Sequence, residues 1–254
     1  MAYTYGTSEP AAARLEAIAK FFNPLSAGFV RDFAPNPVRK VLDLGCGPGF
    51  TTSMLSEATG CPVVCGLDSS PDFLAMARER FPHCEFLEHD VTAVPFPVTA
   101  DLIYARFLLS HLKQPVRLVN EWTTQLNEEG RLILEETGNI ETDVQVFKDY
   151  LAVSAMMIEK QGAKLHIGDT LGSGSYDAQV VFNKSLRLPV ADGQAATWFL
   201  PNTLTLWEQN QKVLDALSAS ERRKISGELS RIMNSQSKES NITWNIRRVV
   251  LSRP

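Results

Sequence analysis

The 254-residue sequence is poor in cysteine, and its four cysteines have neither the C-x-x-C pairs of a zinc site nor the density of a disulfide framework. It contains no apolar run of roughly 18 residues, the length that a membrane-spanning helix needs. Basic residues are also few, since 25 Lys and Arg face 29 Asp and Glu and the formal net charge is −4. We therefore expect reduced core thiols and no bound metal, and neither a membrane nor a nucleic acid as partner.

The opening segment MAYTYGTSEP lacks the basic and then apolar layout of a secretory signal. The hydrophobic fraction of 44% and the charged fraction of 21% are ordinary for a globular protein, and the length suits one or two domains. These features predict a cytoplasmic globular protein. They do not determine the oligomeric state, and a homodimer remains one of the alternatives.

From about residue 38 the sequence alternates short β-rich runs with helical segments, a pattern typical of an α/β fold with a parallel sheet between two layers of helices. One of the expected helices begins at Pro115, carries Leu126 toward the sheet and ends at Gly130. The strands that we expect cover residues 38–44, 63–67, 84–87, 102–105, 131–134, 179–188 and 242–251.

A glycine loop, Gly45–Gly49, follows the first expected strand. Cofactors bind at such loops in open α/β sheets, but Phe50 stands where a dinucleotide fingerprint has its third glycine. Asp43 precedes the loop, and its carboxylate would repel a pyrophosphate and favour a cationic ligand. Asp68 and Asp90 follow the next two strands, so three acids are expected at one edge of the sheet.

The segment Val41–Gly49 resembles the first motif of the class I S-adenosylmethionine-dependent methyltransferases. Ala105–Leu112 and Leu126–Gly130 resemble small-molecule members of the menaquinone/ubiquinone-biosynthesis-like group. The resemblance implies a Rossmann-like seven-stranded sheet with helices on both faces. The last strand would be inserted antiparallel beside the sixth. Residues 1–37 would form an N-terminal helical cap, residues 38–254 the methyltransferase domain, and residues 139–178 a lid or substrate insertion after strand five.

The resemblance also assigns cofactor-binding residues. Asp68 would accept hydrogen bonds from the ribose hydroxyls, Asp90 and Val91 would hold the adenine, and the backbone carbonyl of Arg106 would hold the methionine ammonium. Tyr3 and Arg14 would help to close the pocket. The full set of expected contacts is Tyr3, Arg14, Asp43, Gly45, Gly47, Gly49, Asp68, Ser69, Asp90, Val91 and Arg106.

The acceptor of the methyl group does not follow from these motifs. His111 is a candidate general base, although we favour a structural role in capping or packing a helix. Glu135 and Glu136 end strand five and either contact the substrate or cap a turn. Tyr5, His111, Met157, His166 and Trp198 are the substrate-contact candidates. Trp198, Phe199, Trp207, Tyr150, Met156 and Met157 could line a pocket, but ordinary core is the interpretation that we favour.

Two other functions remain open at this point. A nicotinamide-dependent oxidoreductase would share the acid at Asp68 but is disfavoured by Phe50 and Asp43. A protein that binds S-adenosylmethionine without transferring the methyl group is the third interpretation.

Overall fold

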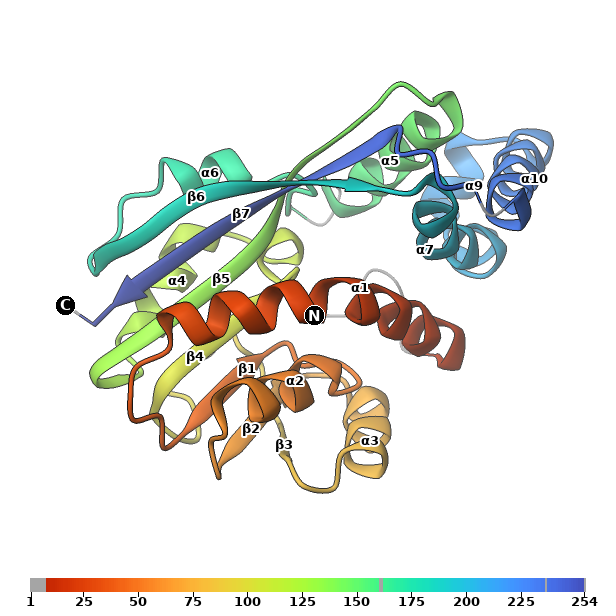
Figure 1. Cartoon of the computed structure of the whole chain (residues 1–254). Helices are drawn as coiled ribbons and strands as arrows, with labels where there is room; N and C mark the ends of the chain where they lie inside the picture. The colour runs from red at the N-terminus through yellow and green to blue at the C-terminus, as the bar shows by residue number, and fades with distance from the viewer. Residues whose placement is uncertain (1–7, 160–161, 236, 254) are drawn as a thin grey trace.

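The protein is described by a computed structural model that covers residues 8–159, 162–235 and 237–253. A seven-stranded sheet runs through it in the order β3-β2-β1-β4-β5-β7-β6 (Figure 1). Neighbouring strands from β3 to β5 are parallel, whereas β7 is antiparallel to both β5 and β6. The expected seven-stranded sheet, with the last strand antiparallel beside the sixth, is confirmed. The strands are β1 (Val41–Leu44), β2 (Val64–Asp68), β3 (Glu85–Glu88), β4 (Ala100–Arg106), β5 (Leu126–Thr142), β6 (Gln179–Val190) and β7 (Ile242–Ser252).

Helices cover both faces of the sheet because successive strand residues point to opposite sides. Val41 belongs to a core beneath α1 (Glu9–Phe33) and α2 (Phe50–Thr59), whereas Leu42 belongs to a core beneath α4 (Pro115–Thr123). The other helical elements are α3 (Pro71–Arg80), the 3₁₀ turn η1 (Leu109–His111), α5 (Gln145–Glu159), α6 (Gly168–Gly172), α7 (Asp192–Leu204), α8 (Leu206–Gln209), α9 (Gln211–Ala216) and α10 (Ala219–Ser235).

The fifth strand is longer than the sequence pattern suggests. It spans 17 residues from Leu126, whereas we expected a helix up to Gly130 and a strand over residues 131–134. Leu126 pairs with Ala100 of β4, and a register shift accommodates the polar residues that follow. Asn127 donates a hydrogen bond to Asp101 at 2.7 Å there, which ties these residues to the sheet. The expectation of a helix over this stretch was wrong.

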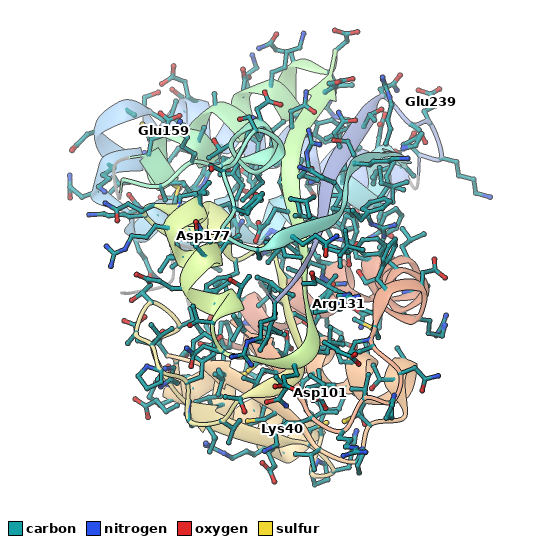
Figure 2. The ribbon with its side chains drawn as sticks, turned by 90° about the vertical axis from the view of Figure 1, so that its left-hand side faces the viewer. Lys40, Asp101, Arg131, Glu159, Asp177 and Glu239 are labelled. Atoms are coloured by element: carbon teal, nitrogen blue, oxygen red, sulfur yellow. The ribbon has the colours of Figure 1, made fainter. Side chains whose placement is uncertain are left out.

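The two ends of the sheet differ in what covers them. Asp101 accepts hydrogen bonds from the backbone N–H groups of Arg39 and Lys40 at 2.8 and 3.0 Å, at the amino-terminal ends of β1 and β4. Figure 2 shows Lys40 and Asp101 close together at this end. At the far ends of β5 and β7, Figure 1 shows α5, α7, α9 and α10 gathered into a helical group.

The glycine-rich segment of residues 162–176, part of the lid or substrate insertion expected over residues 139–178, packs on the sheet. The backbone N–H of Ile167 donates to the carbonyl of Thr137 in β5, and Gly172 lies against Arg247 of β7. The helices α1, α5 and α7 share one apolar core and cover the carboxyl edge of the sheet. Helix α7 was not expected from the sequence. The domain boundaries remain a prediction.

Candidate functional site

A cavity of about 300 Å³ lies at the carboxyl edge of the sheet. Its lower part is lined by the segments that follow β1, β2, β3 and β4, and its upper part by α1, α5, α7, β5 and β7. This volume is in the range of small-molecule sites, and the carboxyl edge is where open α/β sheets bind ligands.

The glycine loop and Asp68 form the floor of the cavity. The backbone N–H of Gly47 donates to Oδ2 of Asp68 at 2.8 Å, and the N–H of Ser70 donates to Oδ1 at 2.9 Å. Burial raises the pKa of Asp68, and these N–H groups act in the opposite direction. Gly47 has a φ of 52°, and a Cβ there would be in ordinary van der Waals contact with Leu15 at 3.9 Å and Phe73 at 4.0 Å, so one carbon fits at this position. Each oxygen of Asp68 keeps a lone pair for a ligand hydroxyl.

Two expected cofactor residues lie behind the loop. Asp43 is only 1% exposed and does not line the cavity, because its carboxylate accepts a hydrogen bond from Thr52 of α2 at 2.7 Å. Its burial raises its pKa to about 7. Gly49 is the N-cap of α2 and lies against Phe81, so it does not line the cavity either. A direct ligand contact by Asp43 or Gly49 therefore does not fit this geometry.

Asp90 and Arg106 line the cavity from the ends of β3 and β4. Oδ1 of Asp90 accepts hydrogen bonds from the backbone N–H and the hydroxyl of Thr92, which lower the pKa of Asp90. The guanidinium of Arg106 donates to Asn23 at 2.7 Å and to Ser26 at 2.9 Å, both on α1. The side chain of Arg106 thus fastens α1 to the sheet.

A second contact fastens the same helix. Arg248 of β7 donates to Glu135 at 2.7 Å and to the carbonyl of Leu25 in α1 at 3.2 Å. Tyr104 donates to the other oxygen of Glu135 at 2.6 Å. Arg14, further along α1, lines the cavity as expected, whereas Tyr3 and Tyr5 lie outside the described residues.

Six aromatic side chains line the upper part of the cavity in one continuous series, the aromatic wall. The ring centroids are 5.0 Å apart for Phe107 and Phe22, 5.7 Å for Phe22 and Trp198, and 5.3 Å for Trp198 and Trp244. The series continues through Phe199 to Tyr150, with separations of 5.7 and 4.1 Å. These rings come from α1, the end of β4, α5, α7 and β7, so separate elements converge on one apolar surface. The aromatic wall consists of Phe22, Phe107, Tyr150, Trp198, Phe199 and Trp244.

His111 lines the cavity from the turn η1. Its burial, together with the charge of Arg14, lowers its pKa to about 4, so the imidazole is neutral at neutral pH. Glu136 holds this turn, since its Oε1 accepts hydrogen bonds from the backbone N–H groups of Leu108 and Leu109, each at 2.7 Å. Burial raises the pKa of Glu136 to about 8. Glu136 therefore caps a turn, one of the two roles open from the sequence.

The remaining candidates divide into two groups. Trp198 lines the cavity, whereas Met157 is 1% exposed in the core and His166 is exposed outside the cavity. Neither Met157 nor His166 therefore fits as a substrate contact in this structure. The described cavity-lining candidates are Arg14, Gly45, Gly47, Asp68, Ser69, Asp90, Val91, Arg106, His111 and Trp198.

Sequence reasoning missed part of the upper cavity. No motif includes Phe22 or Trp244, which are ordinary apolar residues of a helix and a strand in the sequence. Phe107 lies within the segment Ala105–Leu112 but was not named as a contact. Within residues 8–159, 162–235 and 237–253, no cluster of three His, Cys, Asp or Glu could hold a metal, and no helix suits a membrane span.

Comparisons with known proteins identify part of the chain. Residues 41–130 match the family model described as a methyltransferase domain. A trans-aconitate 2-methyltransferase of Escherichia coli O139:H28 (strain E24377A / ETEC) is 34% identical over 102 residues, and the match spans 40% of this chain and 40% of that relative.

Two solved structures are similar over most of the chain. A Haemonchus contortus phosphoethanolamine N-methyltransferase 2, in complex with phosphomonomethylethanolamine and S-adenosylhomocysteine, has a TM-score of 0.59 and 15% identity and covers 99% of this chain and 61% of its own. A coclaurine N-methyltransferase bound to N-methylheliamine and S-adenosylhomocysteine has a TM-score of 0.58 and 17% identity, with coverage of 91% and 72%. Residues 41–130 are therefore similar to a methyltransferase domain, and the chain as a whole shares the fold of these two methyltransferases.

Proposed function

We propose that this chain is an S-adenosylmethionine-dependent methyltransferase that methylates a small molecule. The matched methyltransferase domain, residues 41–130, contains the glycine loop and the ends of β1 to β4 that line the lower cavity. Solved structures of the same fold contain S-adenosylhomocysteine, the product of such a reaction.

The contact between Gly47 and Asp68 is the observation that carries the proposal. Asp68 offers a partly buried carboxylate at the end of β2, next to the glycine loop, and both Asp68 and Gly47 line the cavity. A carboxylate suits the two hydroxyls of a ribose, a group that S-adenosylmethionine and a dinucleotide share. The residues present fit S-adenosylmethionine, and Phe50, which stands at the third glycine position of a dinucleotide fingerprint, disfavours the dinucleotide.

Each lining residue then has a proposed role. Asp68 and Ser69 bind the ribose, Asp90 and Val91 bind the adenine, and the loop of Gly45 and Gly47 lies along the amino-acid part, where Arg14 and the carbonyl of Arg106 help to hold it. Asp43 acts indirectly, because its hydrogen bond to Thr52 anchors α2 beneath the loop.

The cofactor, when bound, supplies a methyl group that is already activated on a positively charged sulfur. The chain contributes alignment, since α1, α5 and α7 enclose the cavity and hold the acceptor at near-attack distance for in-line displacement. The same helices exclude water, which would otherwise solvate the nucleophile. An amine or an activated carbon as acceptor needs no general base, whereas a hydroxyl needs one. For a hydroxyl acceptor the candidate base is His111, the cavity-lining imidazole closest in sequence to the end of β4.

The setting of the enzyme is also a proposal. The net charge of −4 favours a small-molecule acceptor over a nucleic acid. We further propose a cytoplasmic location and kinship with the menaquinone/ubiquinone-biosynthesis-like group, on the residues of Ala105–Leu112. Trans-aconitate, the acceptor in the name of the curated relatives, carries three carboxylates and belongs among the acceptors to be tested.

Isothermal titration calorimetry with S-adenosylhomocysteine tests the proposal, with NADH as the control ligand. Micromolar binding of S-adenosylhomocysteine alone is the expected result. Binding of NADH in its place would instead support a nicotinamide-dependent oxidoreductase. Acceptor-dependent release of S-adenosylhomocysteine from S-adenosylmethionine then separates an enzyme from a protein that only binds the cofactor.

A further inference from the structure

Most charged side chains of the cavity lie in its lower part. Arg14, Asp68, Asp90 and Arg106 are the lining aspartates and arginines, and in the described chain no Lys or Glu lines the cavity. Three of the four lie at the ends of β2, β3 and β4, where the proposed function places the cofactor, and the fourth, Arg14, lies on α1. The upper part is bounded by the aromatic wall, by Ile18, Ile140 and Leu165, and by the hydroxyl-bearing Thr137 and Ser154.

The two arginines offer little to a charged acceptor. The guanidinium of Arg106 is turned toward α1 by its hydrogen bonds to Asn23 and Ser26. The charge of Arg14 reaches His111 and Tyr150, but the proposed function assigns Arg14 to the cofactor. A carboxylate on the acceptor would therefore lose its hydration in the cavity without gaining a cationic partner. A buried unpaired charge is strongly unfavourable.

The aromatic wall, in contrast, is complementary to a ring. Its six side chains form one series of stacked and edge-to-face contacts, and Trp198 and Tyr150 are 1% and 3% exposed, so the wall is held in place by packing. A flat apolar molecule placed against it gains buried area and ring contacts without losing any hydrogen bond. His111, uncharged at neutral pH, lines the cavity from the same β4–η1 segment as Phe107 of the wall.

We propose that the acceptor is an uncharged, flat molecule with an aromatic ring, which packs against the aromatic wall while its polar reacting group faces His111. The inference rests on the proposed function, because the upper cavity is an acceptor site only if the lower cavity holds the cofactor. It excludes polycarboxylates as acceptors.

Calorimetric titration of the protein saturated with S-adenosylhomocysteine tests the inference with a matched set of probes. The probes are 2-naphthol, 2-naphthoate, 2-naphthylmethylamine and citrate. We expect 2-naphthol to bind at least about tenfold more tightly than either charged naphthalene, and citrate not to bind, because the charged groups lose their hydration without a partner. Equal or tighter binding of a charged probe, or no binding of 2-naphthol, would overturn the acceptor class.

The same experiment separates the two proposals. Binding of S-adenosylhomocysteine without binding of 2-naphthol contradicts the acceptor class and leaves the methyltransferase proposal standing. Binding of 2-naphthol without binding of S-adenosylhomocysteine contradicts the methyltransferase proposal, and with it the designation of this site as an acceptor site.

Two tryptophans provide a matched pair of variants. The indole N–H groups of Trp198 and Trp207 are both buried and have no hydrogen-bond partner among the described residues, but only Trp198 lines the cavity. We expect Trp198→Phe to weaken the binding of 2-naphthol by about threefold or more, through lost contact area, and to leave S-adenosylhomocysteine binding unchanged. Trp207→Phe should change neither the binding of 2-naphthol nor the binding of S-adenosylhomocysteine. Equal effects of the two variants on 2-naphthol would contradict the proposal.

A charge placed in the upper cavity provides the converse test. Ile140→Arg puts a guanidinium on β5 among the apolar lining, and Gln145→Arg adds the same charge at an exposed position of α5. Ile140→Arg should shift the preference from 2-naphthol toward 2-naphthoate by about tenfold, and Gln145→Arg should leave it unchanged. An unchanged preference in folded Ile140→Arg would contradict the proposal. If thermal melting shows that Ile140→Arg does not fold, the tryptophan pair decides.

Discussion

The backbone N–H of Gly47 donates a hydrogen bond of 2.8 Å to the carboxylate of Asp68 and thereby joins the glycine loop after β1 to the end of β2. The N–H of Ser70 binds the other oxygen at 2.9 Å, so both oxygens are held in fixed positions at the floor of the cavity. The carboxylate is therefore preorganised for a ligand with two adjacent hydroxyl groups.

Replacing Asp68 should impair ligand binding more than folding. We expect Asp68→Ala to weaken the binding of S-adenosylhomocysteine by about 1.5–3 kcal/mol, the cost of losing hydrogen bonds to a charged group. Asp68→Asn keeps one carbonyl oxygen and should lose less. Calorimetry measures the affinity, and urea unfolding provides the control for stability. Unchanged affinity in Asp68→Ala would contradict the proposed position of the ribose.

The fastening of α1 by Arg106 leads to a second prediction. Asn23 accepts from Arg106 at 2.7 Å and donates to the carbonyl of Phe50 at 3.0 Å, so Asn23→Ala removes both bonds. We expect about 1 kcal/mol less stability and faster amide hydrogen exchange in α1. Lys20→Ala on the same helix removes only an exposed pair with Glu16 and is the matched control. Identical exchange in the two variants would show that Asn23 does not hold the helix.

Local patterns predicted the alternation of strands and helices, and the family resemblance implied the arrangement of the seven-stranded sheet. Each strand from β1 to β4 is followed by a turn signal, and the glycine loop marks where the first crossover begins. The prediction was wrong over Leu126–Gly130, where Leu126, Glu128 and Glu129 favour a helix locally. The pairing of Leu126 with Ala100 and the contact from Asn127 to Asp101 outweigh that preference, and both partners lie about 26 residues away in the chain.

In the site as well, residues marked by a local sequence pattern could be predicted, whereas residues brought together by contacts between distant segments could not. Asp68 and Asp90 follow strand ends in the sequence, so their position in the cavity could be predicted. The aromatic wall was predicted only in part. Tyr150, Trp198 and Phe199 were named as residues that could line a pocket, although ordinary core was favoured, and they do line the cavity. Phe22 and Trp244 were not named, because they are separated by most of the chain and both reach Trp198 only in the folded structure. Asp43 was expected to contact the ligand, but strand alternation turns its side chain toward Thr52 beneath the loop.

Glu136 gives a third prediction, on the pH dependence of stability. Its pKa is raised from 4.5 to about 8 because burial penalises the ionised form. The stability associated with this group is thus fully present below pH 4.5 and is lost as the pH rises through about 8. Glu136→Gln cannot ionise and keeps an acceptor for the N–H groups of Leu108 and Leu109.

Urea unfolding of the wild type and Glu136→Gln at pH 5 and pH 8.5 measures this effect. We expect similar stabilities at the lower pH and a more stable variant at the higher pH, by about 1–3 kcal/mol. Asp43, whose pKa is also raised, is present in both proteins and cancels in the difference. A difference that does not change with pH would contradict the assignment of a neutral Glu136.

The two glycines that flank Pro48 should respond in opposite ways to alanine. At Gly49, with φ of 87°, a Cβ would lie 2.8 Å from the ring of Phe81 and 3.1 Å from Ala77, so Gly49→Ala adds a steric clash to the cost of the left-handed backbone. We expect a loss of about 2 kcal/mol or more in the free energy of unfolding. At Gly47, with φ of 52°, a Cβ meets nothing closer than 3.9 Å, so Gly47→Ala should lose only about 1 kcal/mol of stability.

Ligand binding should show the reverse order for these two variants. The added methyl group of Gly47→Ala lies beside Leu15 and Phe73, which line the cavity, whereas that of Gly49→Ala lies behind the loop against α3. S-adenosylhomocysteine should therefore bind at least about tenfold more weakly to Gly47→Ala, through steric exclusion, and nearly normally to the folded fraction of Gly49→Ala. Urea unfolding and calorimetry on both variants measure the two effects separately. Wild-type affinity in Gly47→Ala would show that the bound ligand does not approach this backbone, and the cofactor would then have to lie elsewhere in the cavity.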